Sequence, residues 1–178
     1  WWIAALVSLL PASVGAACLI DDEPTRAQEL LRIHLSASCT QAERETHSVD
    51  ASTLLAALKQ GRSVDLDGVV VRGDLVLEAL PVAGKPPPLE SIVDAQNKEI
   101  RIVAGGLSIV NSVVQGKIVH RSPDGSLVFS GPLTLAGTTF EQMVDLSRAI
   151  FTQPVILSGT VLLAEGYFVQ AEFLRGLT

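Results

Sequence analysis

The chain has 178 residues, enough for one ordinary domain with a sizeable core. Its formal net charge is −6, and it has no run of five like charges and no basic patch, so we expect no nucleic-acid partner, because phosphates would be repelled. Aromatic residues make up only 4%, whereas 14 glycines and 9 prolines punctuate the chain, which favours short strands and turns over a helical bundle.

Residues 1–17, "WWIAALVSLLPASVGAA", carry no charge and end in small residues, which predicts a secretory signal peptide cleaved before Cys18. A membrane anchor over residues 1–20 is an alternative, and lipid attachment at Cys18 is a third. A signal peptide begins with Met and basic residues, so we expect the reading frame to start upstream. Each alternative predicts an extracytoplasmic location, periplasmic or secreted, with or without a membrane anchor.

Cys18 and Cys39 are the two cysteines of the chain. In an exported protein a disulfide between them is the simple expectation, whereas cytosolic retention would leave two separate thiols. A loop of this size is expected to contribute about 3 kcal/mol to stability through the entropy of the unfolded chain.

Residues 18–63 are predicted to form a short helical cap. The stretch 21–38, "DDEPTRAQELLRIHLSAS", has acidic residues and a proline before an apolar run, which predicts an amphipathic helix. A second helix is predicted over 48–62, with Asp50 as its N-cap and Gly61 as its stop. The two helices are expected to cover the open end of the structure that begins at Val64.

Large apolar residues recur every eleven positions in the second half of the chain, which sets up columns of equivalent positions. A column of small residues lies two positions before the first of the large ones. We expect the two large columns to point inward: Phe129, Phe140, Phe151, Leu162 and Phe173, and Leu135, Leu146, Leu157 and Phe168.

An eleven-residue period also fits a right-handed coiled coil. Pro132 and Pro154 lie in mid-repeat, where each would cost a helix about 3 kcal/mol. Pairs such as Val144/Leu146 have the period-two spacing of a strand. The pattern therefore predicts a mainly β protein in which each repeat is buried by its neighbours, a β-solenoid.

The same register extends upstream over residues 64–77 and 107–120. The step from Val114 to Phe129 contains four extra residues, which we place at the turn "RSPDGS". A longer insertion, residues 78–99, contains three consecutive prolines and is predicted to be an exposed loop. Around Ile100 to Val103 the next apolar pair is out of register by one residue.

Residues 140–151, "FEQMVDLSRAIF", resemble the pentapeptide-repeat family in its eleven-residue variant F-x-x-x-V-D-F-S-x-A-x-F. The resemblance covers 64–178 without the insertions. It implies a right-handed, four-sided β-helix with two eleven-residue units per coil and coils spaced by about 4.8 Å, the usual separation of paired strands.

Residues that could carry chemistry are few. His34, His47 and His120 do not pair at metal-ligand spacing, and His120 falls in an inward column, where a satisfied structural histidine is expected. Asp65, Asp67, Asp74 and Asp145 are the aspartates of the repeats and are expected at solvated outward positions. No catalytic, metal or cofactor motif is recognised.

The leading hypothesis is an exported, non-catalytic solenoid that acts as a rigid scaffold for a protein or an envelope component. Because Thr178 lies inside a repeat, further repeats, a cap or a membrane segment are expected after it. The chain would then be an extracytoplasmic spacer or sensor portion of a larger membrane protein. A polysaccharide-active enzyme is a further alternative, and it would need clustered carboxylates on adjacent repeats.

Overall fold

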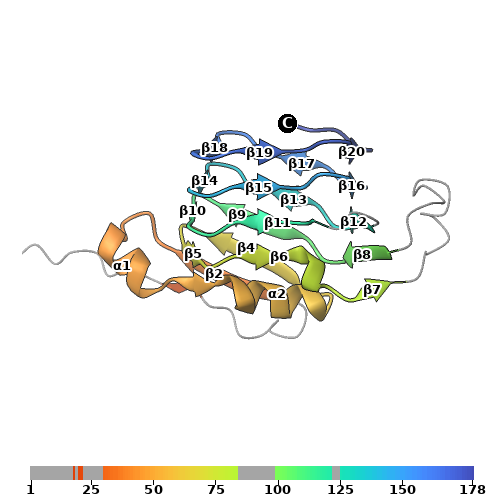
Figure 1. Ribbon diagram of the computed structural model, residues 1–178. Helices are drawn as coiled ribbons and strands as arrows, with labels where there is room; N and C mark the ends of the chain where they lie inside the picture. Colours follow the sequence, from red (N-terminus) through yellow and green to blue (C-terminus); the bar gives the residue numbers. More distant parts are fainter. Residues whose placement is uncertain (1–17, 19, 22–29, 84–98, 122–124) are drawn as a thin grey trace, which may run out of the picture.

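The computed structural model describes residues 18, 20–21, 30–83, 99–121 and 125–178. Residues 1–17, over which a signal peptide or membrane segment is predicted, lie outside the described residues. The described chain is mainly β, with few helices, and most of its strands pair in parallel (Figure 1). The prediction of a mainly β protein is confirmed, and the parallel sheets are compatible with a β-solenoid.

Sixteen of the described strands between residues 63 and 173 form four successive layers, and each layer gives one strand to each of four sheets, A to D. Layer 1 comprises β4 (Ser63–Asp67), β5 (Val70–Arg72), β6 (Leu75–Val76) and β8 (Glu99–Val103). Layer 2 comprises β9 (Leu107–Val110), β10 (Val113–Val114), β11 (Ile118–Val119) and β12 (Gly125–Phe129). Layer 3 comprises β13 (Leu133–Thr134), β14 (Thr139–Phe140), β15 (Val144–Asp145) and β16 (Ala149–Phe151). Layer 4 comprises β17 (Val155–Ile156), β18 (Val161–Leu162), β19 (Gly166–Tyr167) and β20 (Glu172–Phe173).

The pairing register shows how the eleven-residue repeat builds these layers. Leu133 pairs with Val155, 22 residues further on, so two repeats make one layer. Between layers 2 and 3 the step grows to 26 residues for Ile118↔Val144 and returns to 22 for Leu127↔Ala149. The four extra residues therefore lie between β11 and β12, where the turn "RSPDGS" predicts them.

Phenylalanine rings stack through the interior on the sheet D side. Phe129 and Phe151 have ring centroids 4.9 Å apart, and Phe151 and Phe173 have centroids 4.8 Å apart. These distances match the usual separation of paired strands, so each ring lies directly over the equivalent ring of the next layer. Val103 continues this column in layer 1 because it pairs with Phe129, which fixes the register that the sequence leaves open around Ile100 to Val103.

The predicted inward columns differ in exposure along the stack. Five of their residues are almost fully buried: Phe129, Phe140, Phe151, Leu135 and Leu146. Leu157, Phe168 and Phe173, all from layer 4, are partly buried and pack against the core. Leu162 pairs in register with Phe140 and so shares its column, although it is 41% exposed. Among the described residues, layer 4 has a full neighbouring layer on one side only, which explains this difference.

The prediction of a helix over 21–38 is wrong in the described part of that stretch. Residues Leu30–Leu35 form strand β2, which pairs in parallel with β4 and extends sheet A, and Ile20–Asp21 form β1 at its edge. Leu31, Ile33 and Leu35 alternate with Arg32 and His34, so the apolar residues face inward in a strand. Residues 30–35 form a strand rather than a helix because they pair with the edge of β4.

The described part of the N-terminal cap contains two helices. Helix α1 (Gln41–Thr46), which the sequence analysis did not predict, begins with a capping box between Thr40 and Glu43. Strand β3 (Val49–Asp50) follows and pairs with β5. Cys18 and Cys39 form a disulfide, with an S–S distance of 2.00 Å, that ties residue 39, just before α1, to the start of the described chain.

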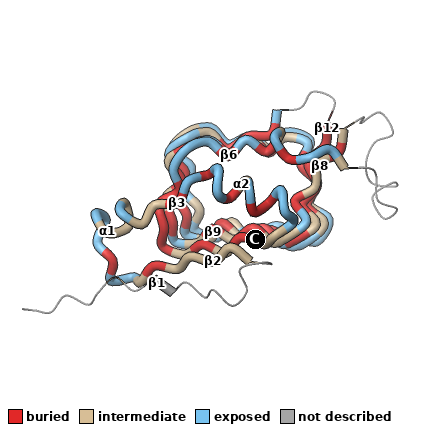
Figure 2. Tube along the Cα trace, turned by 90° about the horizontal axis from the view of Figure 1, so that it is seen from below, coloured by how far each residue is buried: buried red, intermediate tan, exposed pale blue. Residues whose placement is uncertain are grey.

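Helix α2 (Ala51–Lys59) lies where a covering helix is predicted, across the lower end of the stack (Figure 2). Its Ala51, Leu54, Ala57 and Leu58 are buried in the main core. Asp50 is its N-cap residue, although its side chain makes no capping hydrogen bond. Gly61, just beyond the helix, has a φ of 72°, the left-handed conformation typical of a helix stop.

The insertion 78–99 is not wholly an exposed loop. It begins within a 3₁₀ turn, η2 (Leu77–Ala79), and continues through Leu80, which is buried, to strand β7 (Val82–Ala83). Strand β7 pairs antiparallel with β8, at the edge of sheet D. Residues 84–98 lie outside the described residues.

Candidate functional site

The outward face of sheet A carries two neighbouring groups of linked polar side chains. Successive strand residues point to opposite faces, so Val64 and Leu66 face inward while Asp65 and Asp67 face outward. The same alternation places Arg32 and His34 of β2 outward beside them. We call the face formed by Arg32, His34, Asp65, Asp67, Ser108, Thr134 and Ile156 the sheet A surface.

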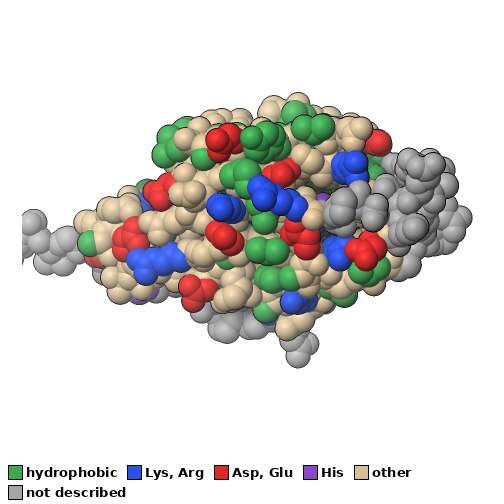
Figure 3. Space-filling model, viewed as in Figure 1, with side chains coloured by type: hydrophobic (Ala, Val, Ile, Leu, Met, Phe, Trp, Pro, Cys, Tyr) green, Lys and Arg blue, Asp and Glu red, His purple; other side chains and the backbone are tan. Residues whose placement is uncertain are grey.

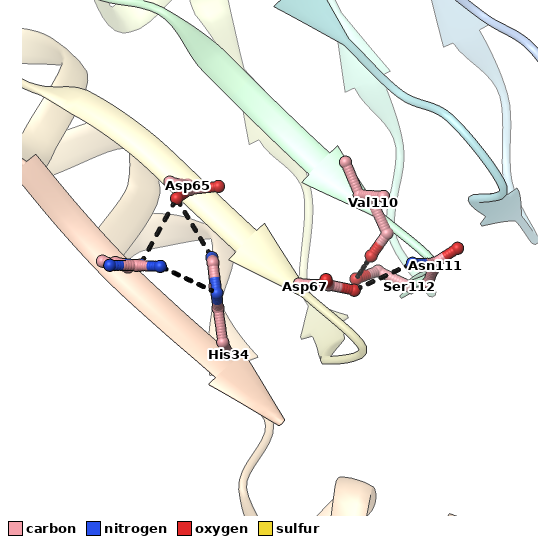
Figure 4. Close-up of polar contacts among 7 residues, drawn as sticks. His34, Asp65, Asp67, Val110, Asn111 and Ser112 are labelled. Carbon is pink, nitrogen blue, oxygen red and sulfur yellow. Dashed lines mark hydrogen bonds and ion pairs between the residues drawn. The ribbon is translucent and has the colours of Figure 1, made fainter. Parts of the chain in front are cut away.

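Asp65 lies between a guanidinium and an imidazole (Figure 4). Its Oδ2 is 3.0 Å from His34 Nε2 and 3.6 Å from Arg32 Nε. Arg32 Nη2 is 3.4 Å from His34 Nδ1, and because a guanidinium only donates, Nδ1 is the acceptor in this contact. His34 Nε2 makes no hydrogen bond with the described residues, so its approach to Asp65 is a close polar contact.

A second group of polar contacts lies beside the Arg32–His34–Asp65 group, at the turn between sheets A and B (Figure 4). Asn111 Nδ2 donates to Asp67 Oδ1 at 3.0 Å. The next residue, Ser112, is buried, and its hydroxyl donates to Val110 O at 2.7 Å and accepts from Val69 N at 3.1 Å. The outward side chains are therefore anchored to a turn whose buried hydroxyl is itself fully bonded.

The four aspartates of the repeats do not come together. Asp65 and Asp67 lie on the sheet A surface, Asp74 accepts a hydrogen bond from Lys117 N at the turn between sheets B and C, and Asp145 lies outward on sheet C. Asp145 Oδ2 is 3.7 Å from Arg121 Nε, and its Oδ1 accepts from Ser147 N. These four residues thus do not form the carboxylate cluster that a polysaccharide-active enzyme needs.

The remaining sheet faces are occupied differently. On sheet B, Glu45 of α1 binds Arg72 and Gln115, so the cap covers part of that face. On sheet D, the outward residues Ile100, Val128 and Ile150 are buried in a small second apolar cluster. The face seen in Figure 3 intersperses apolar, basic and acidic side chains, without a large area of one sign.

Histidines 34 and 120 have different environments. His34 belongs to the sheet A surface, and sequence reasoning missed its contact with Asp65 because it assigned residue 34 to a helix. His120 lies in the interior, as predicted, but its buried Nε2 makes no hydrogen bond within the part of the chain that the structure describes, where a satisfied ring is expected.

Within the described residues, no helix is long and apolar enough to cross a membrane. The same residues contain no group of three or more His, Cys, Asp or Glu side chains placed to hold a metal ion. No family model, no curated protein and no solved structure matches the chain.

Proposed function

We propose that this chain is an exported, non-catalytic solenoid that presents the sheet A surface as a rigid binding face to a protein or an envelope component. The single observation that carries the proposal is the network Arg32–His34–Asp65 with its neighbour Asp67–Asn111. These side chains are held by one another before any partner arrives, so binding would cost little side-chain entropy.

The size of the surface supports this choice of face. Sheet A has six of the described strands, more than any other sheet in that part of the chain, and extends from the cap through layer 4. Arg32, His34 and Asp65 have side chains 30%, 23% and 34% exposed, so they are accessible yet constrained. A face of half-exposed polar groups over a packed core is typical of the rim and hydrogen-bonding part of non-obligate interfaces.

We further propose that the four layers wind as a right-handed, four-sided β-helix of the pentapeptide-repeat type. The step of 22 residues per layer and the stacking of equivalent residues at strand spacing support this interpretation. A crystal structure would test it directly, because a left-handed path or a three-sided cross-section would contradict it.

Export is the second component of the proposal. The disulfide between Cys18 and Cys39 supports it, because such bonds persist in oxidising compartments. The test is fractionation of the source cells, followed by maleimide labelling of the intact chain. Export predicts the chain in the extracytoplasmic fraction with both thiols blocked until a reductant is added. Cytoplasmic protein with two reactive thiols would refute it.

Site-specific photo-cross-linking in the source cells tests the binding face. Ile156 on the sheet A surface is 37% exposed and Val76 on sheet C is 39% exposed, so a cross-linking residue at either position has similar access to solvent. We expect one adduct of defined mass from position 156 and none from position 76. Thr134→Arg should abolish the adduct because it places a bulky charge next to position 156, whereas Val76→Arg should leave it.

The proposal fails if both positions give the same adducts, or if Thr134→Arg leaves the adduct at position 156 intact while the protein remains folded.

A further inference from the structure

His120 occupies an interior column that is otherwise apolar. It follows β11 directly, and the pairings of Val119 with Val76 and with Asp145 bring His120 to the level of Leu77 in layer 1 and Leu146 in layer 3. All three side chains are buried, with His120 only 3% exposed. An ionisable ring therefore takes the place of a leucine at the corner where sheet C meets sheet D.

The polar groups around this ring come from several elements. Among these groups, the charge of Arg101 on β8 has the largest effect on the pKa of His120. The Arg101 guanidinium donates to Glu78 O and to Glu99 Oε2, each at 2.9 Å. Asp145 of β15 provides the opposing charge, and the backbone of Ser147 also favours the protonated ring. The carboxylate of Glu78, in η2, accepts from Arg121 N, and Arg121 itself pairs with Asp145.

This arrangement disfavours a charged ring. Burial, and then the charge of Arg101, lower the pKa of His120 below its usual value, while Ser147 and Asp145 oppose the shift only in part. His120 Nε2 is fully inaccessible and makes no hydrogen bond with the described residues, so no acceptor waits for a second ring proton. The ring is neutral in the folded protein at neutral pH.

The consequence for stability has a definite sign. The unfolded chain takes up a proton on His120 at about pH 6.5, before the folded chain does. Stability from the neutral ring is therefore fully present above about pH 6.5 and is lost as the pH falls toward the lowered folded pKa.

In layers 1 and 2, sheet C contributes shorter strands than sheets A and D do. Strands β6, β11 and β15 each have two residues. Layers 1 and 2 both receive extra residues between sheet C and sheet D, as the 43-residue step Leu75↔Ile118 and the 26-residue step Ile118↔Val144 show. Local opening around a charged His120 would therefore break few backbone hydrogen bonds.

We propose that His120 makes the corner between sheets C and D an acid-sensitive element, closed at neutral pH and opened locally when the ring takes up a proton. Opening would separate β11 from β6 and β15 while sheet A stays paired. The device would let acidity alter one side of the protein without unfolding the proposed binding face, so it goes beyond the scaffold function.

Amide hydrogen exchange tests the location of the change. After correction for intrinsic exchange rates, protection of residues 118–120 and 144–146 should fall at least about tenfold between about pH 7.5 and pH 5, as local opening requires. The matched variant is His120→Leu, which restores the apolar column and cannot titrate, and it should keep its protection. Residues 133–134 and 155–156 of sheet A should change little in either protein.

Equal loss of protection in wild type and His120→Leu, or loss that is uniform over sheets A and C, would overturn the proposal. A second measurement does not depend on that variant folding: titration of the His120 ring by NMR, assigned with His34→Gln and His47→Gln. We expect a midpoint below about 6.5 that rises in Arg101→Gln. A midpoint at or above the usual value, or one that Arg101→Gln leaves unchanged, would contradict the inference.

Discussion

Asn111 donates its side-chain amide to Asp67 Oδ1 at 3.0 Å although 44 residues separate them in the chain. Asn111 has a φ of 49°, a left-handed conformation that Asn adopts more readily than most residues. The turn above it is close, because a Cβ added at Gly137 would lie 2.7 Å from Asn111 Oδ1. The Asn111 side chain therefore ties the turn of layer 2 to Asp67 in layer 1. It also leaves no space for a side chain at Gly137 in layer 3.

Replacing Asn111 by Asp should destabilise the protein more than replacing it by Gly. Gly keeps the left-handed turn and loses only the hydrogen bond, which we expect to cost about 1 kcal/mol. Asp also fits the turn but places a second carboxylate beside Asp67, adding repulsion that depends on ionic strength. Urea denaturation at low and high salt measures both effects, and a salt-independent difference between the variants would contradict the explanation.

Phe151 and Gln153 provide a matched test of the inward columns. Phe151 is 1% exposed and stacked between Phe129 and Phe173, whereas Gln153 is exposed. Phe151→Asp should lower the free energy of unfolding by about 4 kcal/mol or prevent folding, because it removes a large apolar side chain and buries an unpaired charge. Gln153→Asp should change it by less than about 0.5 kcal/mol. Similar tolerance of the two changes in thermal melts would mean that the column assignment is wrong.

The repeat makes most of the interior predictable because it combines two signals. The period of two within a strand identifies the residues that face inward. The period of eleven predicts that the equivalent residues of the next repeat, half a layer further on, face inward as well. Together they correctly predict buried residues from Val64 in layer 1 to Leu146 in layer 3. They do not give the exposure of Leu162, which shares the column of Phe140 yet is 41% exposed, because sequence equivalence does not say whether a neighbouring layer covers a residue.

The cap was harder to predict because its sequence is compatible with more than one conformation. Leu30, Leu31, Ile33 and Leu35 fit one face of a helix as well as they fit a strand, and the pairing with β4 that decides between them is a tertiary contact. Helix α1, in contrast, had a readable signal in Thr40 and Glu43, the spacing of a capping box.

The candidate site shows the same limit. Alternation along the strand is enough to predict that Asp65 and Asp67 face outward. It does not predict their partners, because Arg32 comes from cap strand β2 and Asn111 from layer 2, and only the pairing register brings them together.

Two neighbouring glycines, Gly106 and Gly131, should respond in opposite ways to alanine. A Cβ on Gly131 would lie 2.4 Å from Gly105 O, a backbone atom that cannot move without shifting a layer. A Cβ on Gly106 would make an ordinary 3.5 Å contact with the Pro132 ring. Gly131→Ala should therefore cost about 3 kcal/mol, while Gly106→Ala should be neutral or stabilise by about 0.5 kcal/mol through the unfolded state. Equal effects in chemical denaturation would show that the layers are not packed this closely at the corner between sheets D and A.

Loss of the disulfide should loosen the cap before it affects the layers. Cys18 and Cys39 close a loop with a sequence separation of 21, for which the chain-entropy estimate is about 3 kcal/mol. Cys39 itself is buried in the main core, and its carbonyl accepts from Arg44 Nε, so the bond fixes the segment that leads into α1. Cys39→Ser and Cys18→Ser should each lower the unfolding free energy by about that amount, and adding a reductant should destabilise the wild type alone.

Hydrogen exchange locates the effect of losing the disulfide. Protection should fall first in residues 41–46, which carry the Glu45 contacts to Arg72 and Gln115, and should persist in β13 and β16. If a reductant destabilised the serine variants as much as the wild type, the disulfide could not be the cause.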